Sequence, residues 1–472
     1  MNQAWAVIGR SLPRRDAPAK VTGAARYTDD INVPGAWFGL TVRSSEARAR
    51  LLGIERDPSF DWSRVVVVTA TDIRGENVVH LDSDDQPALV EEEIHHHSEA
   101  VALIAGPDPA TVRAAWAALS LRTEALPAIL DPLVSRQAFA RYEITKGDLA
   151  AGWAQADLVV EGTYRVGPQE HLYIEPQAMI ATPTAEGGIS VLGSLQCPYY
   201  VHAALARALG LPIEKVQVSA AEIGGAFGGK EEYPSMLAIH AALLAQAAGR
   251  PVRMTYDRHE DIAATTKRHA AVVHHRTGVM ADGRLVAQDI DIVMDGGAYT
   301  TLSPVVLSRG ALHATGPYNC PNVRVRARAM MTNTVPAGAF RGFGAPQTEF
   351  AAELQISRIA EALGLSPVEL RRRLVYQVGD VTATGQVLKN SAAMLEVLAR
   401  VNQVSHFEQA RARADRSTGP GRVIPGGRQI ATGVGLALGW HGAGFTGDGE
   451  RSLNSRVGIE LTAGAKIRIL SA

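Results

Sequence analysis

The sequence predicts an α+β protein of two or three domains, and three observations support this prediction. The chain has 472 residues, more than one ordinary domain holds, and 46% of them are hydrophobic, enough for sizeable cores. Short β-branched runs alternate with stretches of helical periodicity. The 45 glycines and 24 prolines indicate many turns between these elements.

The first part of the chain combines strands with a helix. The run "SRVVVVTATDI" (63–73) and the run "AVALIAG" (100–106) are typical of strands. The segment "DPATVRAAWAALS" has helical periodicity and begins at Asp108, a suitable N-cap. A proline-containing stretch near residue 130 predicts a domain boundary.

The central part contains a strand, a glycine loop and a helix in succession. "PYYVHAALARALG" (198–210) is predicted to be a helix that ends at glycine, and "KVQVSA" (215–220) a strand. The loop "GGAFGGKE" (224–231) comes next. It leads into the Ala-rich helix "PSMLAIHAALLAQAAG" (234–249), which has Pro at its start and Gly at its end.

The remaining elements continue the mixture. Residues 269–300 alternate well around an Asp-Gly pair, which predicts a β-hairpin. Residues 348–364 and 366–377 are predicted helices, the second opening with a Ser-Pro-x-Glu capping pattern. Near the end, "SRVGIELTAGAKIRILSA" (455–472) predicts a pair of strands.

Composition and charge narrow the function classes. The net charge is −1, without a basic or acidic block that favours nucleic acid or a membrane surface. Only Cys197 and Cys320 are present, too few for a [2Fe–2S] cluster or a disulfide framework. The first residues lack the apolar core of a secretion signal, and no stretch approaches 18 uncharged apolar residues. A cytoplasmic location is the expectation.

The glycine loop 224–231 raises a question about phosphate. Its spacing matches the Walker A frame of a P-loop up to Lys230, but Glu231 occupies the position where a P-loop needs Ser or Thr for Mg²⁺. A strand, exposed backbone N–H groups and a following helix favour an anion. Glycines that serve only a tight turn remain the alternative, and an NTPase is the weakest interpretation.

A second unusual stretch is "GAFRGFGAPQ" (338–347). Glycines surround Phe340, Arg341 and Phe343, which places rings and a guanidinium on an irregular backbone. Such a combination suits a flat heterocycle or an anionic cofactor. A buried loop with the two Phe rings in the core explains the pattern equally well.

The histidine run "EIHHHSE" (93–99) is a weak metal signal. Adjacent histidines do not share one face of a strand or helix, and catalytic zinc sites draw spaced ligands. The chain contains no G-x-S-x-G or H-E-x-x-H motif, so serine hydrolase and zincin functions have no support.

Together the two glycine-rich loops, in this order and at this spacing, resemble the molybdenum-cofactor subunit of the xanthine dehydrogenase / aldehyde oxidase family. Three further segments are similar to that family: "GRSLPRRDAPAKVTGAARYTDDI" (9–31), "PQEHLYIEPQAMIATP" (168–183) and "GDVTATGQVL" (379–388). The resemblance covers essentially the whole chain.

That resemblance implies an α+β arrangement of three parts. An N-terminal α/β hammerhead domain would cover residues 1–130, and the first molybdopterin-binding domain would cover 140–400. Residues 401–472 would begin a second, incomplete molybdopterin-binding domain.

The resemblance also assigns residues to a molybdenum site. Gln196 matches a Gln that hydrogen-bonds an oxo ligand of molybdenum, and Arg341 matches an Arg close to the metal. Gly225, Phe227 and Gly228 match the backbone beside the metal centre. These residues would lie behind the ligands that the pterin and the oxo, hydroxo and sulfido groups supply.

Three residues match substrate-binding positions. Glu231 matches the carboxylate that holds a purine, Arg309 the Arg that stabilises charge building on the purine, and Phe343 the ring that stacks on it. Aldehyde oxidases of the family typically have apolar residues in place of the first two. The expected substrate is therefore hypoxanthine or xanthine, hydroxylated with water-derived oxygen. Nicotinate-like heteroaromatics and aldehydes remain alternatives.

The expected partners follow from what the chain lacks. The family's "MGQG" loop and its catalytic Glu have no counterpart in this sequence. A second chain supplying this C-terminal half is the favoured expectation, and an inactive truncated or assembly fragment is the alternative. A [2Fe–2S] subunit and an FAD subunit would accept the electrons.

Two further expectations concern the cofactor and the substrate. The molybdopterin could be the cytosine dinucleotide form. Phe445 is a candidate second ring.

Overall fold

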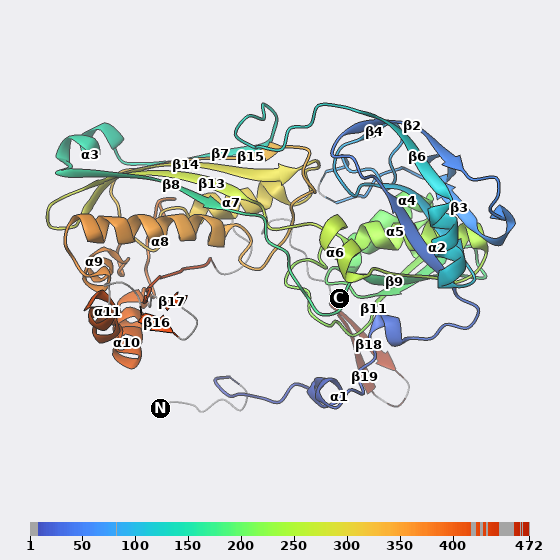
Figure 1. Ribbon diagram of the computed structural model, residues 1–472. Helices are drawn as coiled ribbons and strands as arrows, with labels where there is room; N and C mark the ends of the chain where they lie inside the picture. The colour runs from blue at the N-terminus through green and yellow to red at the C-terminus, as the bar shows by residue number, and fades with distance from the viewer. Residues whose placement is uncertain are drawn as a thin grey trace.

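The computed structural model describes most of the chain. It covers residues 8–416 apart from residue 82, and residues 422–424, 428–430, 433–442, 457–462, 464 and 466–471. The described residues form a mixed α/β protein with two large sheets, seen side by side in Figure 1.

A seven-stranded sheet forms the right-hand part of Figure 1, with the strand order β11-β10-β9-β12-β1-β5-β3. Its strands are β1 (Trp37–Arg43), β3 (Val66–Thr69), β5 (Ala100–Gly106), β9 (Ala178–Pro183), β10 (Ile189–Gly193), β11 (Val216–Ala220) and β12 (Val252–Thr255). Strands from before and after residue 130 share this sheet through the parallel pair β1–β12, in which Trp37 lies opposite Val252. The domain boundaries stay a prediction.

Two helices bury the apolar surface of this sheet. α4 (Pro198–Leu209) and α5 (Pro234–Ala248) pack on each other and share one hydrophobic core with the sheet. Each helix ends at a glycine in the left-handed region, Gly210 and Gly249, as the sequence predicts. α5 is buried nearly all round, which fixes the chain directly after the glycine loop.

A smaller three-stranded sheet completes the N-terminal part. It has the order β4-β2-β6, from β4 (Glu93–Ile94), β2 (Ala49–Arg56) and β6 (Leu119–Ala125). Beside it lies α2 (Pro109–Ala117), where the Asp108 side chain accepts a hydrogen bond from the Thr111 N–H, so the predicted cap is confirmed.

The strand predicted at 63–73 is shorter than expected. Only β3 is extended, and short 3₁₀ turns precede and follow it. Aspartate side chains explain these turns: Asp61 accepts from the Ser63 N–H, and Asp72 accepts from the Thr69 N–H. Such local bonds compete with strand pairing.

The second large sheet has five strands in the order β7-β15-β14-β13-β8. They are β7 (Ala138–Lys146), β8 (Leu158–Val166), β13 (Ala271–Val279), β14 (Leu285–Gly297) and β15 (Val323–Met331). The predicted hairpin is the antiparallel pair β13–β14, with Gly283 at φ +92° in its turn. α7 (Ser303–His313) and α8 (Ala345–Ala362) pack against one face of this sheet.

The other described elements are short or lie at the edges. They are α1 (Ala17–Val21), α3 (Leu149–Gln155), α6 (Arg258–Ala264), α9 (Pro367–Leu374), α10 (Met394–Ser405), α11 (Phe407–Arg416), β16 (Arg422–Ile424), β17 (Arg428–Ile430), β18 (Val457–Thr462) and β19 (Lys466–Ser471). The capped helix α9 and the strand pair β18–β19 confirm two predictions. Phe445 lies outside the described residues.

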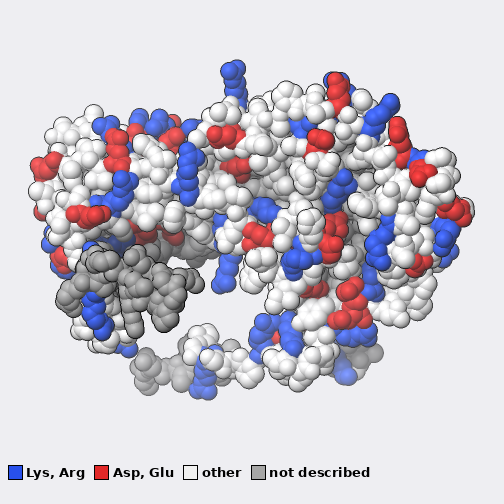
Figure 2. Space-filling view, in the orientation of Figure 1, with Lys and Arg blue, Asp and Glu red and all other residues white. Residues whose placement is uncertain are grey.

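Charge on the visible surface is mixed. Figure 2 shows acidic and basic side chains interspersed over this face, in keeping with the net charge of −1. No helix within the described ranges is long and apolar enough to cross a membrane.

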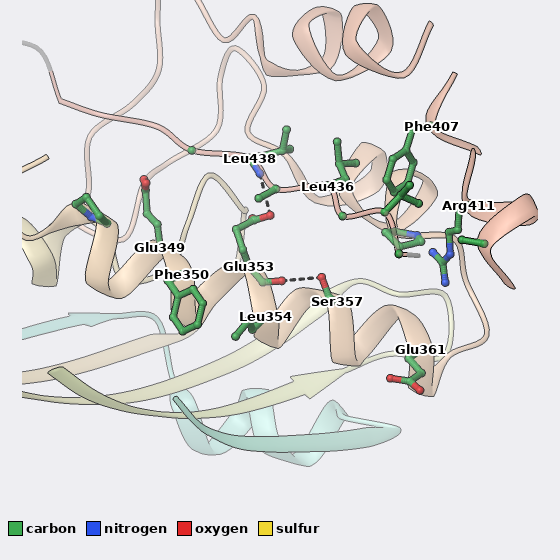
Figure 3. Close-up of a pocket in the computed structure, with 18 residues that line it drawn as sticks. Glu349, Phe350, Glu353, Leu354, Ser357, Glu361, Phe407, Arg411, Leu436 and Leu438 are labelled. Carbon is green, nitrogen blue, oxygen red and sulfur yellow. Dashed lines mark hydrogen bonds between the residues drawn. The ribbon is translucent and has the colours of Figure 1, made fainter. Parts of the chain in front are cut away.

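A groove of about 830 Å³ runs along α8, between this helix and residues 433–439 (Figure 3). Glu353 holds the two walls together, since its carboxylate accepts from the Leu438 N–H at 2.8 Å. The same carboxylate forms a buried ion pair with Arg371 at 2.7 Å and accepts from the Tyr318 hydroxyl.

We expect Glu353→Ala to lower the free energy of unfolding by about 3–5 kcal/mol, because it leaves the Arg371 guanidinium buried without a counter-ion. Urea unfolding measures the change. Glu369→Ala, which removes the exposed pairing of Glu369 with Arg372 and Arg373, is the control and should cost less than ~1 kcal/mol. Equal losses in the two variants would contradict the structural role of Glu353.

Candidate functional site

The glycine loop 224–231 is held at both ends by Glu175. The Glu175 carboxylate accepts from the Gly224 N–H at 2.7 Å and from the Lys230 Nζ at 2.9 Å. The Ser194 hydroxyl, next to β10, donates to the same oxygen at 2.7 Å. Lys230 is completely buried, so its ammonium group serves this internal ion pair.

Gln196 holds the middle of the loop. Its side-chain oxygen accepts from the Gly228 N–H at 3.0 Å and from the Lys230 N–H at 3.3 Å. Its backbone N–H donates to the Lys230 carbonyl at 2.6 Å. The side-chain NH₂ group makes no hydrogen bond within the part of the chain that the structure describes, and Gln196 is exposed. This amide therefore presents a donor outward.

Unusual backbone angles shape the loop. Gly225 and Gly228 have φ values of +99° and +100°, and Phe227 between them has φ +56°. A non-glycine residue in this region costs energy, so it indicates a conformation imposed by its surroundings. Phe227 is 46% exposed, which leaves an aromatic residue at the surface of the site.

The second loop, residues 338–344, lies directly on the first. The Arg341 N–H donates to the Phe227 carbonyl at 2.9 Å. A Cβ atom on Gly228 would lie 2.8 Å from the Ala339 carbonyl oxygen, so only glycine permits this approach. Phe343 has φ +51°, and its N–H donates to the Phe340 carbonyl at 2.7 Å. The two loops therefore form one junction.

Arg309 reaches the junction from α7. A Cβ atom on Gly344 would lie 2.1 Å from the Val306 carbonyl, one turn earlier in that helix. The Arg309 guanidinium is buried and lies 3.1 Å from the His441 ring, which in turn lies 3.3 Å from the Gly342 carbonyl. Burial lowers the pKa of Arg309.

Two adjacent carboxyl groups follow the glycine loop. Burial raises the pKa of the partly buried Glu231. Burial and the neighbouring Glu231 raise the pKa of Glu232 to about 8. Glu232 accepts from the Ala339 N–H at 3.1 Å, and so ties the end of the first loop to the second.

The structure brings most of the predicted site residues into one region. Contacts join Gln196, Phe227, Gly228 and Arg341, and Gly225 belongs to the same loop. Phe343 belongs to the second loop, where its N–H donates to the Phe340 carbonyl. No described contact joins Glu231 to Arg309, so a shared role of these two side chains stays a prediction.

Lys230 is not placed as a phosphate-binding lysine, although the spacing of the glycine loop resembles that of a P-loop. Lys230 donates to Glu175 and to the Ser194 hydroxyl, and its Nζ lies 4.6 Å from the centre of the Tyr173 ring. A P-loop lysine has to reach a nucleotide phosphate. The ion pair explains the position of this lysine without any nucleotide.

Sequence reasoning did not identify the residues that hold the loops in place. Two of them contact the second loop through its carbonyl groups, His171 at Ala339 and Arg268 at Arg341; the others are Glu175, Glu232 and His441. His171 and Glu175 lie within the segment 168–183, in which His171 and Tyr173 are buried and Glu175 is partly buried. A clustering of ionisable residues in an otherwise apolar stretch was the available signal.

The described residues contain no candidate site at which side chains alone would bind a metal ion. Among the described residues, no group of three or more His, Cys, Asp or Glu side chains could hold a metal ion. In the run 95–97, His96 is buried and burial lowers its pKa to about 3, while the Ser98 hydroxyl bonds His97. The two cysteines are free thiols.

Comparison with known proteins matches two families along the chain. Residues 22–127 match the aldehyde oxidase and xanthine dehydrogenase a/b hammerhead domain. Residues 133–375 match the molybdopterin cofactor-binding domain.

Two individual relatives belong to the same family as the matched domains. The chain is 34% identical over 427 residues to the nicotinate dehydrogenase large molybdopterin subunit of Eubacterium barkeri, covering 87% of this chain and 100% of that relative. It is 33% identical over 415 residues to the xanthine dehydrogenase of Emericella nidulans, covering 86% of this chain and 30% of that protein.

Among solved structures, the aldehyde oxidoreductase of Desulfovibrio gigas superposes with a TM-score of 0.78 at 28% identity, covering 86% of this chain and 47% of that one. The chain thus spans half the length or less of some of the proteins it matches. It belongs to the aldehyde oxidase and xanthine dehydrogenase family and contains that family's hammerhead and molybdopterin cofactor-binding domains.

We expect Gly228→Ala to destabilise the chain more than Gly187→Ala. Both glycines have positive φ, so both variants incur backbone strain of roughly 1–2 kcal/mol. Only at Gly228 does the new methyl meet another backbone, which adds about 1–3 kcal/mol. Chemical denaturation compares the two. Equal destabilisation would mean that the loops do not touch as described.

A second prediction concerns pH. The pKa of Glu232 is raised to about 8 in the folded chain, above its ordinary value of 4.5. The folded state therefore keeps a proton that the unfolded state loses, and stability falls as the pH rises from about 4.5 to about 8. Glu232→Gln keeps the acceptor for Ala339 and should lose less stability than wild type between pH 5 and pH 8. Parallel pH profiles would refute the assignment.

Proposed function

We propose that this family member is the molybdenum-cofactor subunit of a hydroxylase that oxidises electron-poor N-heteroaromatic compounds, with hypoxanthine and xanthine as the leading substrates. One observation carries the proposal: two glycine-rich loops meet at the Arg341–Phe227 hydrogen bond, beside an outward-facing amide on Gln196. Membership of the family indicates the reaction, which is hydroxylation at a molybdenum cofactor held at this junction.

The residues at the junction fit an anionic cofactor. Because loop N–H groups occupy the oxygen of Gln196, its NH₂ group is the part left to donate to an acceptor such as an oxo group. Arg341 adds an exposed guanidinium, and the exposed Phe227 lies on the same junction, since its carbonyl accepts from the Arg341 N–H. We assign the holding of the cofactor to Gln196, Gly225, Phe227, Gly228 and Arg341.

When bound, the molybdenum cofactor supplies the two-electron oxidation and the transfer of oxygen derived from water. The chain's own residues bind and orient the substrate. Arg309 holds a fixed positive charge where negative charge develops on the heterocycle, and a buried charge counts more there than in water. The partly buried Glu231 carboxylate can accept a hydrogen bond from a ring N–H or a ring substituent. The Phe343 ring offers a stacking face.

A nicotinate-like substrate is the second candidate. The relative matched over its whole length is named a nicotinate dehydrogenase subunit. Nicotinate is a heteroaromatic ring with an anionic carboxylate, which the Arg309 guanidinium also suits. The likeness to an aldehyde oxidoreductase leaves aldehydes as a third class. Enzymes of this one family act on all three substrate classes, so only measured turnover can show whether purines, nicotinate-like compounds or aldehydes are the substrates.

Further chains are proposed to complete the enzyme. A second molybdopterin-binding chain would supply the catalytic base, and the whole-length match to a relative named a large molybdopterin subunit supports such a division. Subunits with [2Fe–2S] clusters and FAD would carry the electrons away, because this chain has only two cysteines. The proposed molybdopterin form is the cytosine dinucleotide.

Substrate profiling of the native complex tests the proposal. Turnover of xanthine or hypoxanthine, with oxygen from ¹⁸O-labelled water in the product, is the expected result. Turnover of nicotinate alone would replace the purine assignment with the second candidate. Exclusive turnover of aldehydes would exclude both, and a complex without molybdenum would mean an inactive fragment.

We expect Glu231→Ala and Arg309→Met each to lower kcat/KM for the purine by about 10²-fold, because each removes a group that contacts the substrate. Molybdenum content should stay close to that of wild type. Glu186→Ala, in the exposed turn between β9 and β10, is the control and should change neither quantity. Loss of molybdenum from the first two variants would make these residues structural.

A further inference from the structure

Arg268 is a buried cation directly behind the second loop. It lies between α6 and β13, and only 7% of the residue is exposed. Its Nη2 donates to the Arg341 carbonyl at 3.1 Å, and its Nε donates to the Gln169 side-chain oxygen at 2.9 Å. The remaining nitrogen, Nη1, is buried and has no hydrogen-bond partner among the described residues.

The Phe340 ring is enclosed by Arg268 and His171. The Arg268 guanidinium lies 3.8 Å from the ring centre, and the His171 ring stacks at 4.3 Å with an interplanar angle of 18°. Two groups this close cannot occupy the same face of Phe340, so they cover opposite faces. Burial lowers the pKa of His171 to about 4, and its Nε2–H donates to the Ala339 carbonyl at 2.7 Å.

Arg268 lacks the counter-ion that two other buried cations and its partly buried neighbour Lys267 have. Lys230 pairs with Glu175, Arg371 with Glu353, and the neighbouring Lys267 with Glu170. No carboxylate within the described ranges pairs with Arg268.

Burial lowers the pKa of Arg268 only to about 10, so the group stays charged at neutral pH. An unpaired buried charge costs stability. Residues that lower the stability of the folded state in this way are concentrated at functional sites.

We propose that Arg268 is a positioning residue, whose guanidinium fixes the Arg341 backbone and the Phe340 ring so that the second loop presents Arg341 and Phe343 to the reaction. This inference rests on the proposed function. The planar fork stacks on Phe340 and donates along two directions at once, which neither a lysine nor an apolar side chain can reproduce. Arg268 acts through its neighbours and need not touch the substrate.

The test compares Arg268→Met with Arg276→Met in the purified native complex. Arg276 is a matched control, since its guanidinium also lies over an aromatic ring, 4.5 Å from the centre of Trp153, but on β13 and paired with Glu161. We expect R268M to lower kcat by about 10- to 100-fold with a much smaller change in KM, because the loop loses its exact placement. R276M should leave both constants unchanged.

The thermal midpoint separates positioning from a structural role. Removing an uncompensated cation should leave the midpoint of R268M equal to or above that of wild type, with molybdenum content unchanged. R268K keeps the charge and should recover part of the lost kcat. An unchanged kcat in R268M, or a midpoint that falls together with the activity, would overturn the inference. Failure of the proposed function would appear in the wild-type complex itself, as missing molybdenum or missing turnover.

Discussion

The buried ion pair between Lys230 and Glu175 is the contact on which the rest of the site depends. One carboxylate oxygen receives the Lys230 ammonium, the Gly224 N–H and the Ser194 hydroxyl, and so closes the glycine loop on itself. Inside the protein each of these bonds gains strength because water does not compete. If Glu175 were removed, the Lys230 charge would remain buried without a counter-ion, so the ion pair favours this one arrangement of the loop.

The second loop takes its shape from the first. The Phe227 carbonyl receives the Arg341 N–H, and Glu232 receives the Ala339 N–H, so two residues of the second loop are placed by the first. Phe227 and Phe343 both adopt positive φ values. Conformations of this cost persist only where surrounding contacts over-determine them. The junction is therefore preorganised, which is what a cofactor site and its substrate require.

Local structure could be predicted from the sequence because local chemistry decides it. Asp108 and Gly249 mark helix ends through capping and the left-handed region, and both predictions are confirmed. The family could be predicted for a different reason, since the order and spacing of two rare loops are specific. Strand β3 was predicted too long, because aspartate side chains capture backbone donors on both sides of it.

The contacts that build the site could not be predicted from local pattern. Glu175 and Lys230 are 55 positions apart, and Glu232 and Ala339 are 107 apart, so only the folded chain reveals them as partners. Lys230 even has the spacing of a phosphate-binding lysine. An unpaired charge such as Arg268 is invisible in a sequence, because the sequence does not reveal which carboxylate, if any, each arginine contacts in the fold.

Native mass spectrometry of the complex purified through this chain can decide whether the protein is the molybdenum-cofactor subunit of a larger enzyme. We predict one assembly that contains this chain, a molybdenum-bearing pterin, a second molybdopterin-binding chain, and subunits with [2Fe–2S] clusters and FAD. A chain that is isolated alone, without molybdenum or pterin, from cells supplied with molybdate would contradict it.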